Sequence, residues 1–204
     1  MVKFSVPEKT AQQEQHFFSF SVKDNAVLFA GSRNASVPEH LAKGLVNAFA
    51  RLGFGFFVGC ARGIDERFRK ALAKSQYAEG TFVACAFSKR VQHNMDIGLF
   101  ASCVVPDGVP PKAALVRRTL WMVKRSSLVV LFPDDPETGN WGKGSTVVFN
   151  ATVLQLKPLF VVSKAQPKPK GFYKVLPACF QGLVNGYWVI PHPIEKGGTC
   201  DDES

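Results

Sequence analysis

Short runs of consecutive apolar residues alternate along most of the chain with amphipathic stretches, in which apolar residues recur every three or four positions. Such a run is typical of a parallel strand buried on both faces, and the wider spacing is typical of a helix with one buried side. The runs predict strands at 26–30, 54–58, 81–87, 102–105, 127–132 and 158–162. The amphipathic stretches predict helices at 37–52, 66–74, 112–124 and 144–156. This alternation predicts an α/β fold with a doubly wound, mostly parallel sheet and helices on both faces.

The first predicted helix has signals at both ends. Ser36 is placed to cap it, Glu39 completes a capping box, Pro38 is tolerated in the first turn, and Gly53 is expected to end the helix. Its buried stripe would be Leu41, Leu45, Phe49 and Leu52. The next helix is expected to turn three basic residues outward, namely Arg67, Arg69 and Lys70.

We expect one central domain with two extensions. Residues 1–22 would form an N-terminal extension, with a peripheral strand at 17–22, and residues 23–164 the α/β domain. Residues 165–204 would form a C-terminal extension that packs on the domain and has a disordered end. Within it, 187–190 is expected to lie along a sheet edge.

Composition is that of a soluble globular protein, and we expect the cytoplasm as its compartment. The chain has 204 residues, of which 46% are hydrophobic and 20% charged. It contains no run of about 18 apolar residues, and its first residues form no apolar signal stretch, so we expect neither a membrane span nor secretion. The five cysteines are widely spaced, which indicates reduced thiols, mostly in the core, and neither a disulfide nor a metal site.

The formal net charge of +9 suits a polyanionic partner such as nucleic acid. Lysines that lie on the surface and contact only water would give the same net charge. Charge alone leaves the two interpretations equally open.

Two of the predicted strands end at a glycine, an arrangement that is typical of anion-binding sites in α/β proteins. Strand 26–30 leads into Gly31, Ser32 and Arg33, and strand 54–58 leads into the loop Gly59–Asp65 ahead of a helix. Glycine lets the backbone approach a ligand, and the N-terminus of a helix favours negative charge. Because carboxyl ends of parallel strands meet at one edge of the sheet, we expect the ligand there. With the start of helix 144–156 and two arginines of helix 112–124, the candidate ligand-binding residues are Gly31, Ser32, Arg33, Gly59, Cys60, Ala61, Arg62, Gly63, Asp65, Arg117, Arg118, Gly144, Ser145 and Thr146.

Several candidates also have a structural interpretation. Arg33 follows Gly-Ser at a strand end, which favours a phosphate contact over an exposed loop arginine without a ligand. Asp65 is equally suited to stabilise the first turn of its helix or to contact a ligand hydroxyl. Helix 112–124 has either a basic binding side or a solvated face, formed by Arg117, Arg118, Lys124 and Arg125.

The motifs argue against several enzyme classes. The spacing in Gly142-Lys-Gly-Ser-Thr146 is not that of a P-loop, and no Gly-x-Gly-x-x-Gly turn is present for NAD. No Ser/His/Asp or Cys/His arrangement supplies a nucleophile. We therefore assign no catalytic residue and expect no cofactor or metal.

Taken in order, the motifs resemble those of the DNA-processing protein A (DprA/Smf) family of recombination mediators. Gly31-Ser-Arg33 and Gly59-Cys-Ala-Arg-Gly-Ile-Asp65 resemble its two signature loops, and Val116-Arg-Arg118 stands where that family has an arginine-rich segment. Gly144-Ser145 and the strand after Lys157 resemble its last helix and strand, so the resemblance covers roughly residues 26–162.

The resemblance implies a Rossmann-like domain of the SLOG superfamily. Members bind single-stranded DNA, cleave nucleoside monophosphates (the Lonely Guy phosphoribohydrolases) or sense nucleotide-derived signals. It implies that a phosphate of single-stranded nucleic acid or of a small nucleotide lies on the three loops, often in a homodimer.

One departure bears on activity. The phosphoribohydrolase loop Pro-Gly-Gly-x-Gly-Thr-x-x-Glu ends in a glutamate, and the matching position here is Val148. An apolar side chain can neither transfer a proton nor stabilise an oxocarbenium ion. A nucleotide N-glycosidase is therefore the disfavoured alternative, for which Asp65 and Asp96 would be the candidate acids, and we expect a binding protein.

Overall fold

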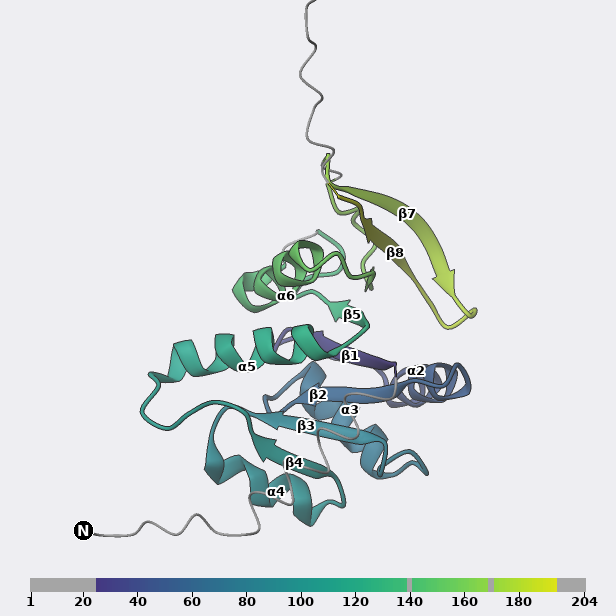
Figure 1. The fold of residues 1–204 in the computed structure, drawn as a ribbon. Helices are drawn as coiled ribbons and strands as arrows, with labels where there is room; N and C mark the ends of the chain where they lie inside the picture. Colours follow the sequence, from purple (N-terminus) through teal and green to yellow (C-terminus); the bar gives the residue numbers. More distant parts are fainter. Residues whose placement is uncertain (1–24, 139–140, 169–170, 194–204) are drawn as a thin grey trace, which may run out of the picture.

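A computed structural model of the protein describes residues 25–138, 141–168 and 171–193. Within these residues the chain forms one eight-stranded sheet with the order β4-β3-β2-β1-β5-β6-β8-β7 (Figure 1). The strands from β4 to β6 are parallel, and β8 and β7 are added antiparallel at one end. The strands are β1 Ala26–Gly31, β2 Gly55–Gly59, β3 Thr81–Cys85, β4 Phe100–Cys103, β5 Leu128–Phe132, β6 Leu159–Val161, β7 Tyr173–Phe180 and β8 Val184–Pro191.

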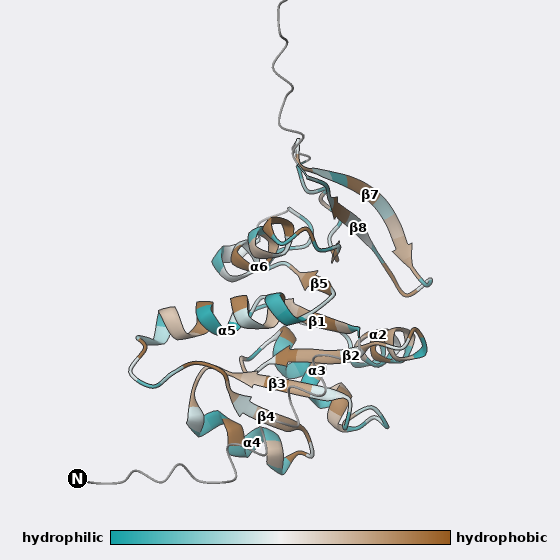
Figure 2. Ribbon diagram, in the orientation of Figure 1, coloured by the Kyte–Doolittle hydropathy of each residue, from teal (hydrophilic) through white to brown (hydrophobic). Residues whose placement is uncertain are grey.

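Helices cover both faces of the sheet. Apolar residues of α2 and α3 join one core cluster, and those of α5 and α6 join the cluster on the opposite face. Figure 2 shows β2 and β5 largely hydrophobic, whereas α5 alternates between hydrophilic and hydrophobic turns. The predicted α/β class, doubly wound and Rossmann-like, is therefore confirmed. The helices are α2 Glu39–Arg51, α3 Ile64–Ala73, the 3-10 turn η1 Ser88–Arg90, α4 Val91–Asp96, α5 Pro111–Arg125 and α6 Gly142–Leu154.

Phenylalanines hold α2 and α3 against the centre of the sheet. Phe29 of β1 stacks on Phe68 of α3 with ring centroids 4.0 Å apart, and it meets Phe49 of α2 edge-on at 5.8 Å. Burying a side chain of this size contributes about 1.5–3 kcal/mol. This packing fixes the helices and, with them, the loops that lead into each helix.

The direction of strand addition reverses at β1. The chain adds β2, β3 and β4 on one side of β1 and then returns to place β5 on the other side. Ligands of open α/β sheets bind at such a switch point, outside the carboxyl ends of the strands. Here the Ser32 N–H donates to the Phe132 carbonyl at 3.0 Å, and a Cβ on Gly31 would overlap that same carbonyl. Only glycine lets the ends of β1 and β5 approach this closely.

The predicted start of the first helix is wrong. The helix begins at Glu39, Pro38 holds the N-cap position, and no side chain caps it, so Ser36 and Glu39 form no capping box. Proline disfavours helical backbone at the residue before it, which keeps Val37 out of the helix. The strand predicted at 17–22 and the disordered end lie outside the described residues.

The C-terminal region continues the sheet as a hairpin. β8 pairs with β6 through Phe160 and Trp188, and β7 forms the outer edge. Phe180 of β7 stacks on Phe49 of α2 with ring centroids 4.6 Å apart. The strand predicted at 187–190 is part of β8, whereas the sequence does not predict β7, because most β7 side chains are exposed or half-buried and give no clear apolar alternation.

The boundaries proposed at residues 22/23 and 164/165 stay a prediction. Of the helices that the structure describes, none has the length and apolar character needed to cross a bilayer.

A lysine from a distant part of the chain closes the carboxyl end of α5. Lys157 Nζ donates to the carbonyls of Val123, Lys124 and Ser126 at 2.6, 2.7 and 2.6 Å. The last carbonyls of a helix lack partners within it and carry partial negative charge. One ammonium group therefore satisfies this end and ties α5 to the segment before β6.

Replacing Lys157 with methionine keeps most of the stem and removes the ammonium. We expect the free energy of unfolding, measured by urea denaturation, to fall by about 1.5–3 kcal/mol, as for hydrogen bonds to a charged group. Lys164→Met is the matched control, because Lys164 pairs with Glu137 on the surface at 3.0 Å. This change should lower the free energy of unfolding by less than about 1 kcal/mol. Equal losses in the two variants would contradict the capping role of Lys157.

Candidate functional site

The loops after β1 and β2 touch at the carboxyl edge of the sheet. The Ile64 N–H donates to the Ser32 carbonyl at 3.2 Å, and a Cβ on Gly63 would overlap the backbone of Ser32 and Arg33. Gly63 also has a φ of 72°, which side chains rarely adopt. The sequence prediction that these two loops lie side by side is confirmed.

Ser32 links this pair of loops to the loop after β5. Its hydroxyl donates a short hydrogen bond to the Asp134 carboxylate and accepts one from the Asn34 N–H at 3.0 Å. The three strands at the switch point therefore end in one connected polar surface.

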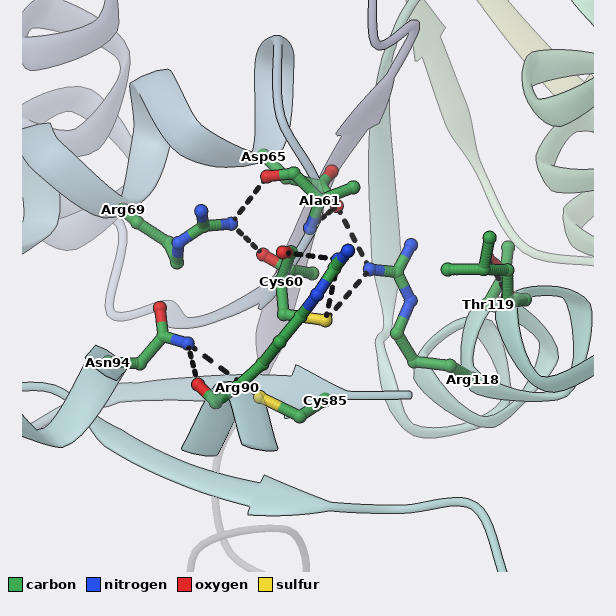
Figure 3. A network of polar contacts seen from close by, with 11 residues as sticks. Cys60, Ala61, Asp65, Arg69, Cys85, Arg90, Asn94, Arg118 and Thr119 are labelled. Atoms are coloured by element: carbon green, nitrogen blue, oxygen red, sulfur yellow. Dashed lines mark hydrogen bonds and ion pairs between the residues drawn. The ribbon is translucent and has the colours of Figure 1, made fainter. Parts of the chain in front are cut away.

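A buried ion pair organises the Gly59–Asp65 loop. Asp65 of α3 and Arg118 of α5 are 4% and 7% exposed, and Arg118 Nη1 lies 3.1 Å from Asp65 Oδ2 (Figure 3). The same carboxylate oxygen accepts the Ala61 N–H at 3.2 Å. A Cβ on Gly59 would overlap both charged groups, so glycine is required there for steric reasons.

Two further arginines hold the backbone of this loop. Arg69 donates to the carbonyls of Gly59 and Ala61 at 2.5 and 2.9 Å, and Arg90 donates to the Cys60 carbonyl at 3.0 Å. Arg69 is 7% exposed, so its predicted outward orientation is wrong. It lies four residues after Asp65 on α3, and this helical spacing was the available signal that both face the same way.

The site carries a surplus of positive charge. Three guanidinium groups, of Arg69, Arg90 and Arg118, contact the Gly59–Asp65 loop, whose one carboxylate is that of Asp65. Burial opposes the charge of Arg118, but Asp65 and Cys60 outweigh it and raise the pKa of this guanidinium. Burial lowers the pKa of Arg69, and Asp65 counteracts that effect. A site with this balance favours a neighbouring anion.

The structure separates the candidate residues into two groups. Arg33, Arg62 and Arg117 are exposed, whereas Asp65 and Arg118 are buried and paired with each other. Not all four basic residues of α5 that the sequence offered for a binding side or a solvated face lie on one exposed side. Arg118 points into the loop and the Arg125 guanidinium lies 4.0 Å from the centre of the Trp121 ring, while Arg117 and Lys124 are exposed.

The third predicted loop opens α6 with a buried hydroxyl. Ser145 is 2% exposed, and its Oγ has no hydrogen-bond partner among the described residues. Thr146 is exposed and donates to the Gly142 carbonyl at 2.9 Å. No side chain caps this helix N-terminus, so its backbone donors and Ser145 offer hydrogen bonds to an anion.

The residues considered for glycoside cleavage are arranged differently. Val148 is 5% exposed and belongs to the core cluster beneath α6. Asp96 accepts a hydrogen bond from Gln92 at 2.7 Å on the exposed side of α4, and Asp65 is held by Arg118. Within the described residues no group of three or more His, Cys, Asp or Glu side chains could hold a metal ion.

Fold and site together define a Rossmann-like α/β protein with arginine-bearing loops at its switch point. No protein-family model matches the chain, and no curated protein does. Among solved structures, its fold is similar to that of DNA processing protein A from Helicobacter pylori, described for its single-stranded DNA binding mode. The TM-score is 0.55 at 17% sequence identity, over 75% of this chain and 70% of that one. At this identity the similarity establishes a DprA-like fold.

Replacing Asp65 with asparagine tests whether the ion pair supports the loop. The change removes the carboxylate that pairs with the buried Arg118, and we expect the free energy of unfolding to fall by about 3–5 kcal/mol. Glu66→Gln is the control at the neighbouring residue, because Glu66 pairs with Lys70 near the surface. It should lower the free energy of unfolding by about 0–1 kcal/mol. Urea denaturation of both variants measures the difference, and comparable losses would argue against the proposed role of Asp65.

Proposed function

We propose that this protein binds single-stranded DNA through phosphate contacts at the carboxyl edge of its sheet, within residues 23–164. Arg33 and Arg62 would neutralise phosphates, and the N-terminus of α6 would donate hydrogen bonds. The proposal is supported by the fold shared with a protein described for single-stranded DNA binding and by the net charge of +9.

One observation carries the proposal. Arg33 and Arg62 are exposed and project from two loops whose backbones touch at Gly63. Beneath them, the surplus positive charge around Asp65 is held in place by hydrogen bonds to the loop backbone. Guanidinium groups bind phosphate in a bidentate manner, and a preorganised site loses less entropy on binding.

Ser145 supplies a second point of contact. A buried hydroxyl without a partner costs free energy in the unbound protein. A phosphate oxygen at the N-terminus of α6 would accept its hydrogen bond and would also interact favourably with the helix dipole.

The motif resemblance supports further parts of the proposal, namely membership of the SLOG superfamily, assembly as a homodimer and action in the cytoplasm. Asp65, Gly59 and Arg118 would position the loop and would not contact the ligand. Glycoside cleavage is disfavoured because Val148 lies in the core, where a catalytic glutamate would be required.

Fluorescence anisotropy of a labelled single-stranded oligonucleotide across a salt series tests this function. Affinity should fall steeply with salt, by about 0.7 logarithmic units per decade for each phosphate contact. Arg33→Ala and Arg62→Ala should each weaken binding about tenfold or more, as expected when a charge-assisted hydrogen bond is lost, and each should reduce the slope.

Arg51→Ala is the matched control, since Arg51 is an exposed arginine at the end of α2, on the opposite edge of the sheet. It should leave affinity within about twofold of the wild type, because its charge is distant and screened. Absence of oligonucleotide binding by the wild type would overturn the proposal and direct the search to small nucleotides. Equal effects of Arg51→Ala and Arg33→Ala would overturn the assigned site.

A further inference from the structure

Three cysteines lie next to one another at the carboxyl ends of neighbouring strands. Cys85 and Cys103 end β3 and β4 and are register partners. Cys60 directly follows Gly59, which pairs with Ala84, so Cys60 lies beside Cys85 at the next position. Neighbouring strands are about 4.8 Å apart, and disulfides need Cα atoms about 4.4–6.8 Å apart. The backbone therefore places Cys60 and Cys85 at a separation that a disulfide can bridge.

The side chains of these two residues also lie in the same part of the core. Cys60 and Cys85 belong to one buried cluster, and each thiol shifts the pKa of the other. Cys103 instead donates its thiol hydrogen to the Val105 carbonyl at 3.4 Å. The pair is thus Cys60 with Cys85, with Cys103 as a neighbour whose thiol is directed elsewhere.

Cys60 faces two guanidinium groups. Its sulfur lies 3.8 Å from Nη1 of Arg118 and 3.8 Å from Nη1 of Arg90 (Figure 3). The nearby carboxylate of Asp65 is already paired with Arg118, and Arg69 lies on the far side of the loop. Surplus positive charge of this kind stabilises a thiolate over a thiol.

The pKa values of the two thiols diverge accordingly. The hydrogen bond from Cys85 and the charge of Arg118 lower the pKa of Cys60 to about 4, against the opposing effect of burial. The pKa of Cys85 is raised, first by its hydrogen bond to Cys60 and then by burial. One thiolate beside one protonated thiol is the arrangement of a nucleophilic and a resolving cysteine.

We propose that Cys60 and Cys85 are a peroxide-reactive thiol pair, and that their oxidation to a disulfide increases the affinity of the Gly59–Asp65 loop for phosphate. The effect on affinity rests on the proposed function, whereas the thiol chemistry stands independently of it.

The oxidation takes two steps with hydrogen peroxide as the oxidant. The Cys60 thiolate attacks one peroxide oxygen, the O–O bond breaks, and the leaving hydroxide takes up a proton to give water and a sulfenic acid on Cys60. The Cys85 sulfur then attacks the Cys60 sulfur as the S–O bond breaks, and its thiol proton combines with the leaving hydroxide to give a second water. Two sulfur atoms together lose the two electrons that peroxide gains.

Oxidation changes the charge next to the Gly59–Asp65 loop. The disulfide removes a negative charge that faces Arg90 and Arg118, so the positive charge of these groups is less compensated beneath Arg33 and Arg62, which would hold the phosphate. Cys60 is 5% exposed, so a molecule as small as peroxide is the suitable oxidant and larger disulfide reagents are not.

Mass mapping of thiols in the full chain, treated with peroxide at pH 6, tests the pair. At this pH only about 0.3% of an ordinary thiol with a pKa near 8.5 is ionised. We expect Cys60 to be oxidised at least about tenfold faster than the exposed Cys179 and to appear in a Cys60–Cys85 disulfide. Cys103→Ser should leave this disulfide intact, and Cys60→Ser should abolish it. A Cys85–Cys103 disulfide in the wild type, or oxidation of Cys179 ahead of Cys60, would overturn the proposal.

Oligonucleotide anisotropy on reduced and oxidised protein tests the link to the site. Affinity should rise about threefold or more on oxidation, and Cys60→Ser should resemble the oxidised form and show no response to peroxide. An unchanged or lower affinity of the oxidised wild type would overturn the regulatory part. If the reduced protein and the oxidised protein both fail to bind, the proposed function has failed, and the mass map alone then decides the thiol pair.

Discussion

A buried ion pair between Asp65 and Arg118 joins helices from opposite faces of the sheet. Asp65 belongs to α3 and Arg118 to α5, and the two meet over Gly59, at the carboxyl end of β2. Their contact is possible only because Gly59 has no side chain. An ion pair so placed fixes the loop, both helices and the end of β2 together, and removing one partner would leave an uncompensated charge in a buried site.

The same arrangement gives the loop its chemical character. Arg69 and Arg90 satisfy loop carbonyls that the turn leaves unpaired, and in doing so they bring in more positive charge than Asp65 balances. That surplus favours an external phosphate and also favours the thiolate of Cys60. The proposed phosphate binding and the proposed reactivity of Cys60 would thus both depend on this one surplus of positive charge.

The loop motif contains residues with two different tasks. Gly59 and Asp65 hold the backbone and are buried, whereas Arg62 is exposed. Gly63 belongs to neither group, because its positive φ and its contact with the loop after β1 set the distance between the two loops. A substitution at Asp65 is therefore expected to act through the fold, and one at Arg62 through the ligand.

The sequence by itself determined the α/β class and the order of the central elements, because runs of apolar residues and apolar residues at helical spacing mark the buried positions. It also located the three loops, since glycine at a strand end is a local signal. Only the tertiary structure decided the roles of the arginines. Arg118 is buried against Asp65, which is distant in sequence, and Arg69 against the loop carbonyls of Gly59 and Ala61, whereas Arg33 and Arg62 are exposed. The pairing of Cys60 with Cys85 likewise depends on the register of β2 against β3. Contacts of this kind arise from strand pairing across long separations, which no local pattern of residues encodes.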